Sequence, residues 1–364
     1  MPNKANLILA GGGHAQLAVL QALAREPLPG FSIRLITPEP VQRYSGMLPG
    51  WIAGHYQSAQ CCIDLRPLAK RAGVSLQLDS VTWLDADTRQ LGLASGEVLS
   101  YQWLSLDIGS GCSLQGLASL GERLLPVRPL AGFFPAWQAL LAEQQAQSGE
   151  QIVVLGGGAA GVELAFGMRQ ALPEAELILI APALLPGHAS GVVRRVARAL
   201  QARGIRWLPM RASAQGDQLL LEDGRLLNPC KVIAATGAQA PACLQGSGLR
   251  LDAQGFVAVN ALHQSVSHPT VFAAGDVCSR SDVVMARSGV HAVHAGPVLA
   301  HNLLASLHGR PLRPYLPRRH SLYLLATGDA RAIASWGALS AEGAWVWRWK
   351  DRIDRNFIRR HMRG

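Results

Sequence analysis

The chain has 364 residues, of which 49% are hydrophobic and 16% charged, and its formal net charge at pH 7 is +10. This length is typical of two or three domains that each bury a hydrophobic core. No stretch reaches the roughly 18 consecutive apolar residues of a membrane-spanning helix, and the amino terminus lacks a signal-peptide pattern, so we expect a cytoplasmic protein. Much of the positive charge follows residue 312, yet no nucleic-acid-binding motif is present, which argues against nucleic acid as a partner.

The first informative segment is NLILAGGGHAQLAVL at residues 6–20. A short apolar strand is followed by Gly11, Gly12 and Gly13, His14 lies within the turn, and a helix is expected over Ala15 to Leu23. In such a turn the glycines and the free N–H groups of the helix terminus bind a pyrophosphate. The third glycine of the GxGxxG fingerprint is replaced by Gln16, so the packing of helix on strand must accommodate a side chain.

A second strand is expected at residues 32–36, and its end is the place where dinucleotide-binding folds present a carboxylate to the adenosine ribose. Thr37 stands at this position, Pro38 follows, and Glu39 is two residues further on. Either the Thr37 hydroxyl or the Glu39 carboxylate would therefore take this role.

The glycine turn occurs a second time in IVVLGGGAAGVELA at residues 152–165, where Gly156, Gly158 and Gly161 complete the GxGxxG fingerprint. Glu163 lies one turn into the helix that follows. Two such units in one chain predict an α/β fold with two Rossmann-like dinucleotide-binding domains.

Three further strands end in glycine turns. Residues 101–108 lead to Gly109 and Ser110, residues 232–236 lead to Gly237, and residues 270–274 lead to Gly275 and Asp276. An acid placed just after a buried strand and a glycine is well positioned to accept a hydrogen bond from a ribityl chain. This pattern indicates a flavin.

The order GGGHAQ, IGS, GGGAAGVE, ATG and AAGD resembles, over nearly the whole chain, the two-dinucleotide-fold flavoproteins of the pyridine nucleotide-disulfide oxidoreductase superfamily. The six cysteines contain no CxxC or CxxxxC pair, which makes the chain similar to the type II NADH dehydrogenases of that superfamily. The segments YSGMLPG, GVHAV with GPVLAHNL, and WVWRWKDRIDRNF resemble the FAD-dependent oxidoreductases that are fused to, or encoded beside, selenophosphate synthetase.

The resemblance implies an enzyme that takes hydride from NAD(P)H onto FAD and passes electrons to a quinone or another small acceptor, without a redox-active disulfide. An association with selenophosphate synthetase is also implied. The alternative is an FAD-bearing partner or redox sensor in selenium metabolism that uses no nicotinamide. The sequence predicts no metal site, because the histidines lack further ligands nearby.

The resemblance also assigns residues. FAD would be held by the first glycine turn and NADH or NADPH by the second. Glu163 would position the nicotinamide as the catalytic residue. The other residues assigned to the flavin are Leu48 and Pro49 near the isoalloxazine, Asp276 on the ribityl chain, and His291 and Ala292 at the pyrimidine edge.

The identity of the nucleotide stays open. The strand at residues 176–180 is followed by Ala181 and Pro182, so no carboxylate is available for the ribose of NADH. Arg194 and Arg195, more than ten residues later, are candidates for binding the 2′-phosphate of NADPH.

The motif order predicts a discontinuous FAD-binding domain made of residues 1–110 and 265–315, an inserted NAD(P)-binding domain at 111–264, and a C-terminal α+β segment at 316–364. Residues 345–362 are expected to form an amphipathic basic helix with Val346, Trp349, Ile353 and Phe357 on one stripe. This helix would either dock on its own domain or lie peripherally on the inner face of the membrane.

Overall fold

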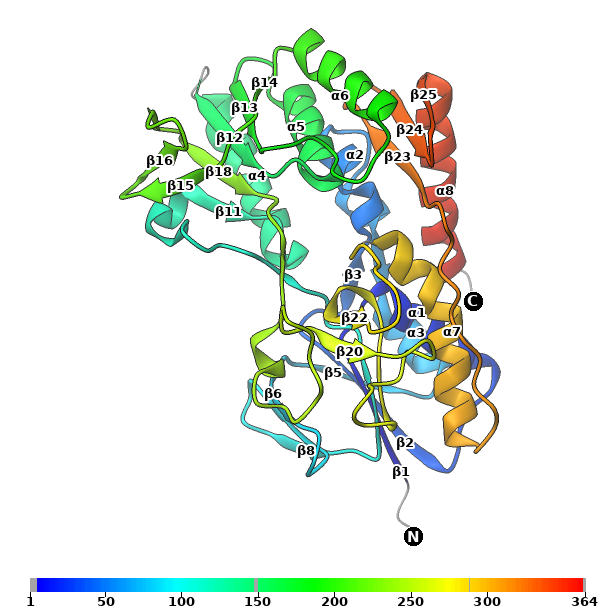
Figure 1. Cartoon of the computed structure of the whole chain (residues 1–364). Coiled ribbons are helices and arrows are strands. Elements are labelled where there is room, and N and C mark those ends of the chain that lie inside the picture. The colour runs from blue at the N-terminus through cyan, green and yellow to red at the C-terminus, as the bar shows by residue number, and fades with distance from the viewer. Residues whose placement is uncertain (1–4, 147–149, 288, 363–364) are drawn as a thin grey trace.

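The computed structural model describes residues 5–146, 150–287 and 289–362 (Figure 1). Its first sheet has the strand order β21-β9-β1-β2-β5, and all neighbouring strands are parallel. The central strands are short apolar runs that are largely buried, as in parallel sheets covered on both faces, whereas the edge strand β5 is partly exposed. They are β1 (Ala5–Ala10), β2 (Phe31–Thr37), β5 (Ser75–Leu78), β9 (Trp103–Leu106) and β21 (Val271–Ala273).

The second sheet repeats this arrangement with the order β11-β18-β12-β13-β14, again fully parallel. The first sheet takes one edge strand, β21, from a distant part of the chain, whereas the edge strand β11 of the second sheet precedes β12 with only a helix between them. The strands of the second sheet are β11 (Leu124–Pro126), β12 (Gln151–Leu155), β13 (Glu176–Ile180), β14 (Arg206–Leu208) and β18 (Lys231–Ala234). Two Rossmann-like units in an α/β fold are thereby confirmed.

Helices cover both sheets. In the first unit, α1 and α7 pack closely because Gly296 brings α7 against Ala15 and Ala18 of α1. In the second unit, α5 follows the glycine turn, and α2 of the first unit packs against it. The helices are α1 (His14–Arg25), α2 (Leu48–Ile52), α3 (Leu65–Arg71), α4 (Leu130–Ala146), α5 (Ala159–Ala171), α6 (Ser190–Ala202), α7 (Gly289–Leu307) and α8 (Ala344–Met362).

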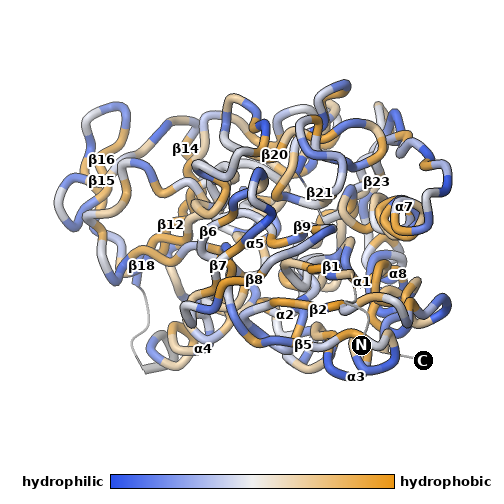
Figure 2. The backbone as a smooth tube through the Cα atoms, turned by 90° about the horizontal axis from the view of Figure 1, so that it is seen from below, coloured by the Kyte–Doolittle hydropathy of each residue, from blue (hydrophilic) through white to orange (hydrophobic). Residues whose placement is uncertain are grey.

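Smaller sheets complete the two units. Each unit carries a three-stranded antiparallel sheet: β6 (Val81–Asp85), β7 (Gln90–Leu93) and β8 (Val98–Ser100) in the first, and β15 (Ala212–Gln215), β16 (Gln218–Leu221) and β17 (Leu226–Leu227) in the second. Two-stranded ribbons pair β3 (Val41–Arg43) with β4 (Cys62–Asp64), β10 (Gly111–Cys112) with β19 (Ala238–Gln239), and β20 (Val257–Val259) with β22 (Cys278–Arg280). Figure 2 shows hydrophobic residues along β1, β2, β12 and β18, whereas many of the peripheral loops are hydrophilic.

The C-terminal segment is α+β, as predicted. An antiparallel sheet of β23 (Leu322–Ala326), β24 (Ala332–Trp336) and β25 (Leu339–Gly343) leads into α8, which runs beside these strands (Figure 1). Helix α6 of the second unit also packs on this sheet. The C-terminal segment therefore joins the second unit to the first, where α8 reaches β4 and the residues before α2.

The predicted apolar stripe of the last helix is half right: Val346 and Phe357 pack inward, whereas Trp349 and Ile353 do not. Val346 is buried, but Trp349 and Ile353 are each 42% exposed, and the inward side of α8 instead carries Lys350 and Asp354. These two charged residues turn inward because each finds a partner there, which removes the cost of burying a lone charge. The helix docks on its own protein with this side, and its outer side presents tryptophan to solvent.

Candidate functional site

The first glycine turn has the geometry of a dinucleotide cradle. Gly11 adopts a φ of +93°, and a Cβ at this position would overlap the backbone carbonyl of Asp107. Only glycine fits such a conformation without strain. The Gly11 N–H donates to the carbonyl of Ile36 at 2.8 Å, which fixes the turn between β1 and β2. Helix α1 begins directly after Gly13, so its first N–H groups border the turn.

Thr37, at the end of β2, borders this turn. Its hydroxyl oxygen would lie 3.3 Å from a Cβ added at Gly12, and it donates to the backbone carbonyl of Glu39 at 3.2 Å. The Glu39 carboxylate forms an ion pair with Arg43, whereas Pro38 is exposed. Of the two alternatives for the ribose, Thr37 is the residue that the fold places beside the glycines.

A buried polar network replaces the missing third glycine. The amide of Gln16 donates to the Ser105 carbonyl at 3.3 Å and accepts from the Ser105 hydroxyl at 2.9 Å. The backbone N–H of Gln16 donates to Asp107 Oδ2 at 2.8 Å. Burial raises the pKa of Asp107 to about 7, although the N–H groups of Gln16 and Ala15 act in the opposite direction. We did not predict Asp107 as a site residue; its signal was an acid at the end of a buried strand.

One ring nitrogen of His14 is buried and has no hydrogen-bond partner in the protein. Its ring packs against Tyr44 and Phe357 with centroid distances of 5.4 and 6.0 Å, and its Nδ1 lies 3.3 Å from Nε2 of Gln42. Its Nε2 is buried without a hydrogen-bond partner, and burial lowers the pKa to about 4, so the ring is neutral. Because buried polar atoms are normally satisfied, an orphaned nitrogen beside a glycine turn fits a phosphate-bearing cofactor such as FAD.

Arg128 joins two of the predicted strand-end turns. Its Nη1 donates to Ser110 Oγ at 2.9 Å and forms an ion pair with Asp276 Oδ2 at 2.8 Å. The turn at Gly109 and Ser110 after β9 thereby meets the turn at Gly275 and Asp276 after β21. Arg128 was not predicted, because nothing local distinguishes an arginine that reaches a site from one in solvent.

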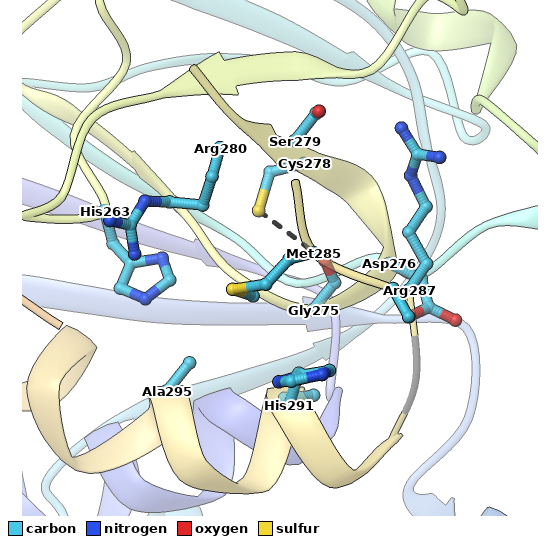
Figure 3. A pocket seen from close by; sticks show the side chains of 12 residues that line it. His263, Gly275, Asp276, Cys278, Ser279, Arg280, Met285, Arg287, His291 and Ala295 are labelled. Carbon is cyan, nitrogen blue, oxygen red and sulfur yellow. Dashed lines mark hydrogen bonds between the residues drawn. The ribbon is translucent and has the colours of Figure 1, made fainter. Parts of the chain in front are cut away.

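Asp276 also lines a pocket between β22 and the start of α7 (Figure 3). His291 and Ala292 contribute to the same pocket from α7, and burial lowers the pKa of His291. Three residues assigned to the flavin by resemblance thus line one cavity. Cys278, on the opposite wall, donates to the Gly275 carbonyl at 3.5 Å.

The second glycine turn is built in the same way. Gly156 has a φ of +128° and is backed by the carbonyl of Ala235, while Gly158, at the start of α5, has open space beside it. Gly161 lies so close to the Gly156 carbonyl that no side chain fits there. Gly237 follows β18 and lies two residues after Ala235 in the chain. The turn and the α5 terminus are therefore accessible to a second nucleotide.

The two arginines that are candidates for binding the 2′-phosphate of NADPH differ in how far they are held by other residues. Arg195 is engaged by the C-terminal sheet, with Nε 3.2 Å from Ser340 Oγ and Nη1 3.3 Å from Glu342 Oε2. Arg194 is exposed and hydrogen-bonds Ser190 at 3.4 Å. Ala181 is buried at the end of β13 and its carbonyl accepts from the Trp207 indole at 3.0 Å.

Glu163 faces the C-terminal segment. Its Oε1 accepts the N–H of Ala326 at 2.8 Å, and burial raises its pKa to about 7 against the opposing effect of Lys350. Lys350 donates to the Gly46 carbonyl at 2.7 Å and pairs with Asp354, which accepts from Tyr44 at 3.2 Å. Helix α8 thus adds a lysine and an aspartate that we did not predict as site residues.

Leu48 and Pro49 open the short helix α2 and are buried. The Pro49 carbonyl would lie 2.9 Å from a Cβ added at Gly167, so α2 meets α5 closely at that point. On the other side, a Cβ at Gly50 would lie 3.0 Å from Trp347 of α8. Both predicted residues therefore lie where the two units and the C-terminal helix converge.

The chain has six cysteines. None of the six forms a disulfide in the described chain. Burial raises the pKa of both Cys61 and Cys278 to about 12, so these thiols are neutral at ordinary pH and are poor nucleophiles.

Comparison with known proteins shows which of them this chain resembles in sequence and in fold. Over 268 residues the chain is 27% identical to ferroptosis suppressor protein 1 of Xenopus laevis, which covers 69% of this chain and 68% of the relative. The fold matches that of the sulfide:quinone oxidoreductase from the hyperthermophilic bacterium Aquifex aeolicus, with a TM-score of 0.81, 17% identity and coverage of 98% and 91% of the two chains. It also matches an engineered water-forming NADPH oxidase bound to NADPH, with a TM-score of 0.73, 18% identity and coverage of 91% and 75%.

The profile of the family described as pyridine nucleotide-disulphide oxidoreductase matches residues 5–302, which include both glycine turns, Glu163 and Asp276. The first turn and the orphaned nitrogen of His14 fit FAD. The protein is an enzyme with FAD as its cofactor and NAD(P)H as its substrate. The chain belongs to the pyridine nucleotide-disulphide oxidoreductase family.

Proposed function

We propose that this oxidoreductase passes the electrons of NAD(P)H through FAD to a quinone. The observation that carries the proposal is the double role of α8: its inner side brings Lys350 beside Glu163 and the Gly46 carbonyl, while its outer side exposes tryptophan and arginine. A site closed by such a helix suits an acceptor that arrives from a membrane. The sulfide:quinone oxidoreductase that shares the fold supports the same acceptor class.

The residues divide the task as follows. Bound FAD supplies the acceptance of hydride and the release of electrons. The first glycine turn, His14 and Asp276 hold this cofactor, and Arg128 keeps Asp276 in place. Gly156 and Gly158 bind the pyrophosphate of the nucleotide, and Glu163 orients its nicotinamide. No thiol is needed, which agrees with the high pKa of Cys61 and Cys278.

The outer side of α8 supports a peripheral membrane location. Trp345 and Trp349 are 52% and 42% exposed, one turn apart, and Arg348 and Arg352 flank them. Tryptophan and arginine on one helix side are typical of a helix that lies in the interface of an anionic bilayer. Among the helices within residues 5–146, 150–287 and 289–362, none is long and apolar enough to cross a membrane. The predicted link to selenophosphate synthetase gains no support from the relatives described above.

A spectroscopic titration tests the proposal. The purified protein is kept anaerobic while NADH and NADPH are added separately, and the flavin absorbance is followed. We expect one nucleotide to bleach the flavin within seconds and a short-chain quinone to restore the colour. Bleaching that a quinone does not reverse, but that another acceptor such as oxygen or ferredoxin does, would reject the quinone and leave the dehydrogenase intact. A flavin that neither nucleotide bleaches would favour the partner or sensor role instead.

A further inference from the structure

The two glycine turns differ at one structurally matched position. The strand that backs the first turn, β9, continues into Asp107, and the strand that backs the second, β18, continues into Ala235. The two residues make the same backbone contact: Asp107 N–H donates to the Ala10 carbonyl at 2.8 Å, and Ala235 N–H donates to the Leu155 carbonyl at 2.9 Å. The chain therefore provides its own comparison between a cradle with an acid and a cradle without one.

The Asp107 side chain lies beneath the first turn. Its Oδ2 accepts the N–H of Gln16 at 2.8 Å, and a Cβ added at Gly13 would overlap its carboxylate. A Cβ added at Gly275 would lie 2.6 Å from its Oδ1. The carboxylate is thus enclosed by α1 on one side and by the turn before η5 (Gly275–Val277) on the other. At the second turn, the matched residues Gly161 and Ala235 place no acid at the terminus of α5.

Asp107 occupies a position that attracts anions. The terminus of α1 favours negative charge because its N–H groups are not used within the helix. The same terminus borders the glycine turn that holds the FAD pyrophosphate. When Asp107 is ionised, a negative charge already lies at this terminus, and the two phosphates add theirs at close range.

The groups facing Asp107 do little to neutralise it. Asp276 on η5 adds a negative charge that raises the pKa of Asp107 further, although Arg128 is paired with Asp276. Cys278 on β22 faces it as a neutral thiol, because burial raises the pKa of that thiol to about 12. On α1, Asp107 receives only backbone N–H groups, those of Ala15 and Gln16. In the part of the chain that the structure describes, no cation forms an ion pair with Asp107.

We propose that Asp107 controls the affinity of the first turn for FAD. Its carboxylate and the FAD pyrophosphate share the N-terminus of α1, and FAD binds tightly only when this carboxylate carries a proton. Loading of FAD above neutral pH is then accompanied by uptake of one proton. The inference concerns FAD, the cofactor of the family, and does not depend on the electron acceptor.

The sign of the pH effect follows from linkage. The bound phosphates raise the pKa of Asp107 above its value of about 7 in the absence of FAD. Well below pH 7 the acid is protonated in both states and the affinity is constant. Above pH 7, binding requires a proton, so the dissociation constant of FAD rises by up to about tenfold per pH unit until the pKa of the complex is reached. His14, with a pKa of about 4, does not titrate in this range.

The experiment compares the full-length holoprotein with its Asp107→Asn variant. Each is diluted at pH 6 to 9, and released FAD is measured by its fluorescence at equilibrium. Asparagine still accepts the Gln16 N–H but carries no charge. We expect the dissociation constant of the native protein to rise at least tenfold from pH 7 to 9, and that of Asp107→Asn to stay flat and low. Equal pH dependence in the two proteins would overturn the proposal, as would weaker binding by the variant at every pH.

Two controls keep the test decisive. Asp217→Asn makes the same chemical change at an exposed acid of a surface ion pair, and its pH profile should match that of the native protein. If Asp107→Asn does not fold, calorimetry of FAD binding to the native chain stripped of FAD, in two buffers of different ionisation enthalpy at pH 8, counts the protons directly. Uptake of close to one proton supports the proposal, and uptake of none refutes it.

Discussion

Lys350 and Asp354 form an ion pair of 3.0 Å one helical turn apart on α8, and both side chains are buried. Lys350 also donates to the Gly46 carbonyl, so the pair fastens the C-terminal helix to the segment before α2. Removing one partner of a buried pair leaves the other charge uncompensated, which costs about 3–5 kcal/mol. We therefore expect Lys350→Met to lower the free energy of unfolding by this amount in urea titrations. Arg348→Met, on the exposed side of the same helix, should change it by less than about 0.5 kcal/mol.

Glu163 should make the reduction of the flavin depend on pH. Burial sets its pKa at about 7, so the carboxylate ionises between pH 6 and 8. As hydride leaves, the nicotinamide ring becomes positive, and an ionised carboxylate beside it stabilises that charge. We expect the rate of bleaching in stopped-flow experiments to rise with pH through about 7. In Glu163→Gln the rate should be about tenfold lower at pH 8 and independent of pH. Glu174→Gln, at an exposed position just after α5, should retain the native profile. A rising profile in Glu163→Gln would assign the ionisation to another group.

Asp107 should also affect the stability of the protein without FAD. Its pKa is about 7 in the folded chain and near 4 in an unfolded one, so the folded state binds more protons between these values. The free energy of unfolding therefore falls as pH rises from 4 to 7, by on the order of 3 kcal/mol from this residue. Denaturant titrations of the FAD-free protein and of Asp107→Asn should diverge over this interval, with the variant more stable at pH 8. Parallel curves would contradict the raised pKa.

Arg128 should be needed to retain FAD. It neutralises Asp276 and bridges it to Ser110, and without it an unpaired carboxylate would be left beside the bound cofactor. We expect Arg128→Met to raise the dissociation constant of FAD about tenfold, which corresponds to about 1.4 kcal/mol. The control is Arg123→Met, which breaks an ion pair with Asp217 elsewhere on the surface. If the two variants released FAD equally, the bridge would have no role in the site.

The outer side of α8 should bind anionic vesicles. We expect the native protein to sediment with vesicles that contain phosphatidylglycerol, less so at high salt, because arginine attraction is screened. The double variant Trp345→Ser, Trp349→Ser should bind about tenfold or more weakly, since it loses apolar area that enters the interface. Trp83→Ser, on β6, removes another exposed tryptophan and serves as the control. Salt-independent binding, or equal binding by the α8 variant, would contradict a membrane role for this helix.

The glycine turns could be predicted because their information is local. Strand, glycine and helix succeed one another within 15 residues, and Gly11 and Gly156 adopt backbone angles that few other residues accept. The α/β fold followed from the same signals. The exact domain boundaries stay a prediction. The pairing of β21 with β9 does join the two predicted parts of the FAD-binding domain in one sheet.

The site residues that the sequence did not predict are held by contacts between distant parts of the chain. Gln16 meets Asp107 across 91 residues, and Lys350 meets the Gly46 carbonyl across 304. No sequence window contains both partners of either contact. The stripe on α8 was wrong at Trp349 and Ile353 for the same reason. Hydropathy alone turns Trp349 inward, whereas Lys350 and Asp354 take that side because Gly46 and Tyr44 satisfy them there.

The edge strand β21 also determines the order in which the chain can fold during synthesis. The first sheet lacks this strand until Val271–Ala273 has left the ribosome, whereas the last strand of the second sheet, β18, ends at Ala234. The second unit can therefore be complete while the first still has an open edge on β9. A nascent chain that stalls between these points would carry a finished nucleotide domain beside an unfinished one, with an unpaired strand available for aggregation or chaperone binding.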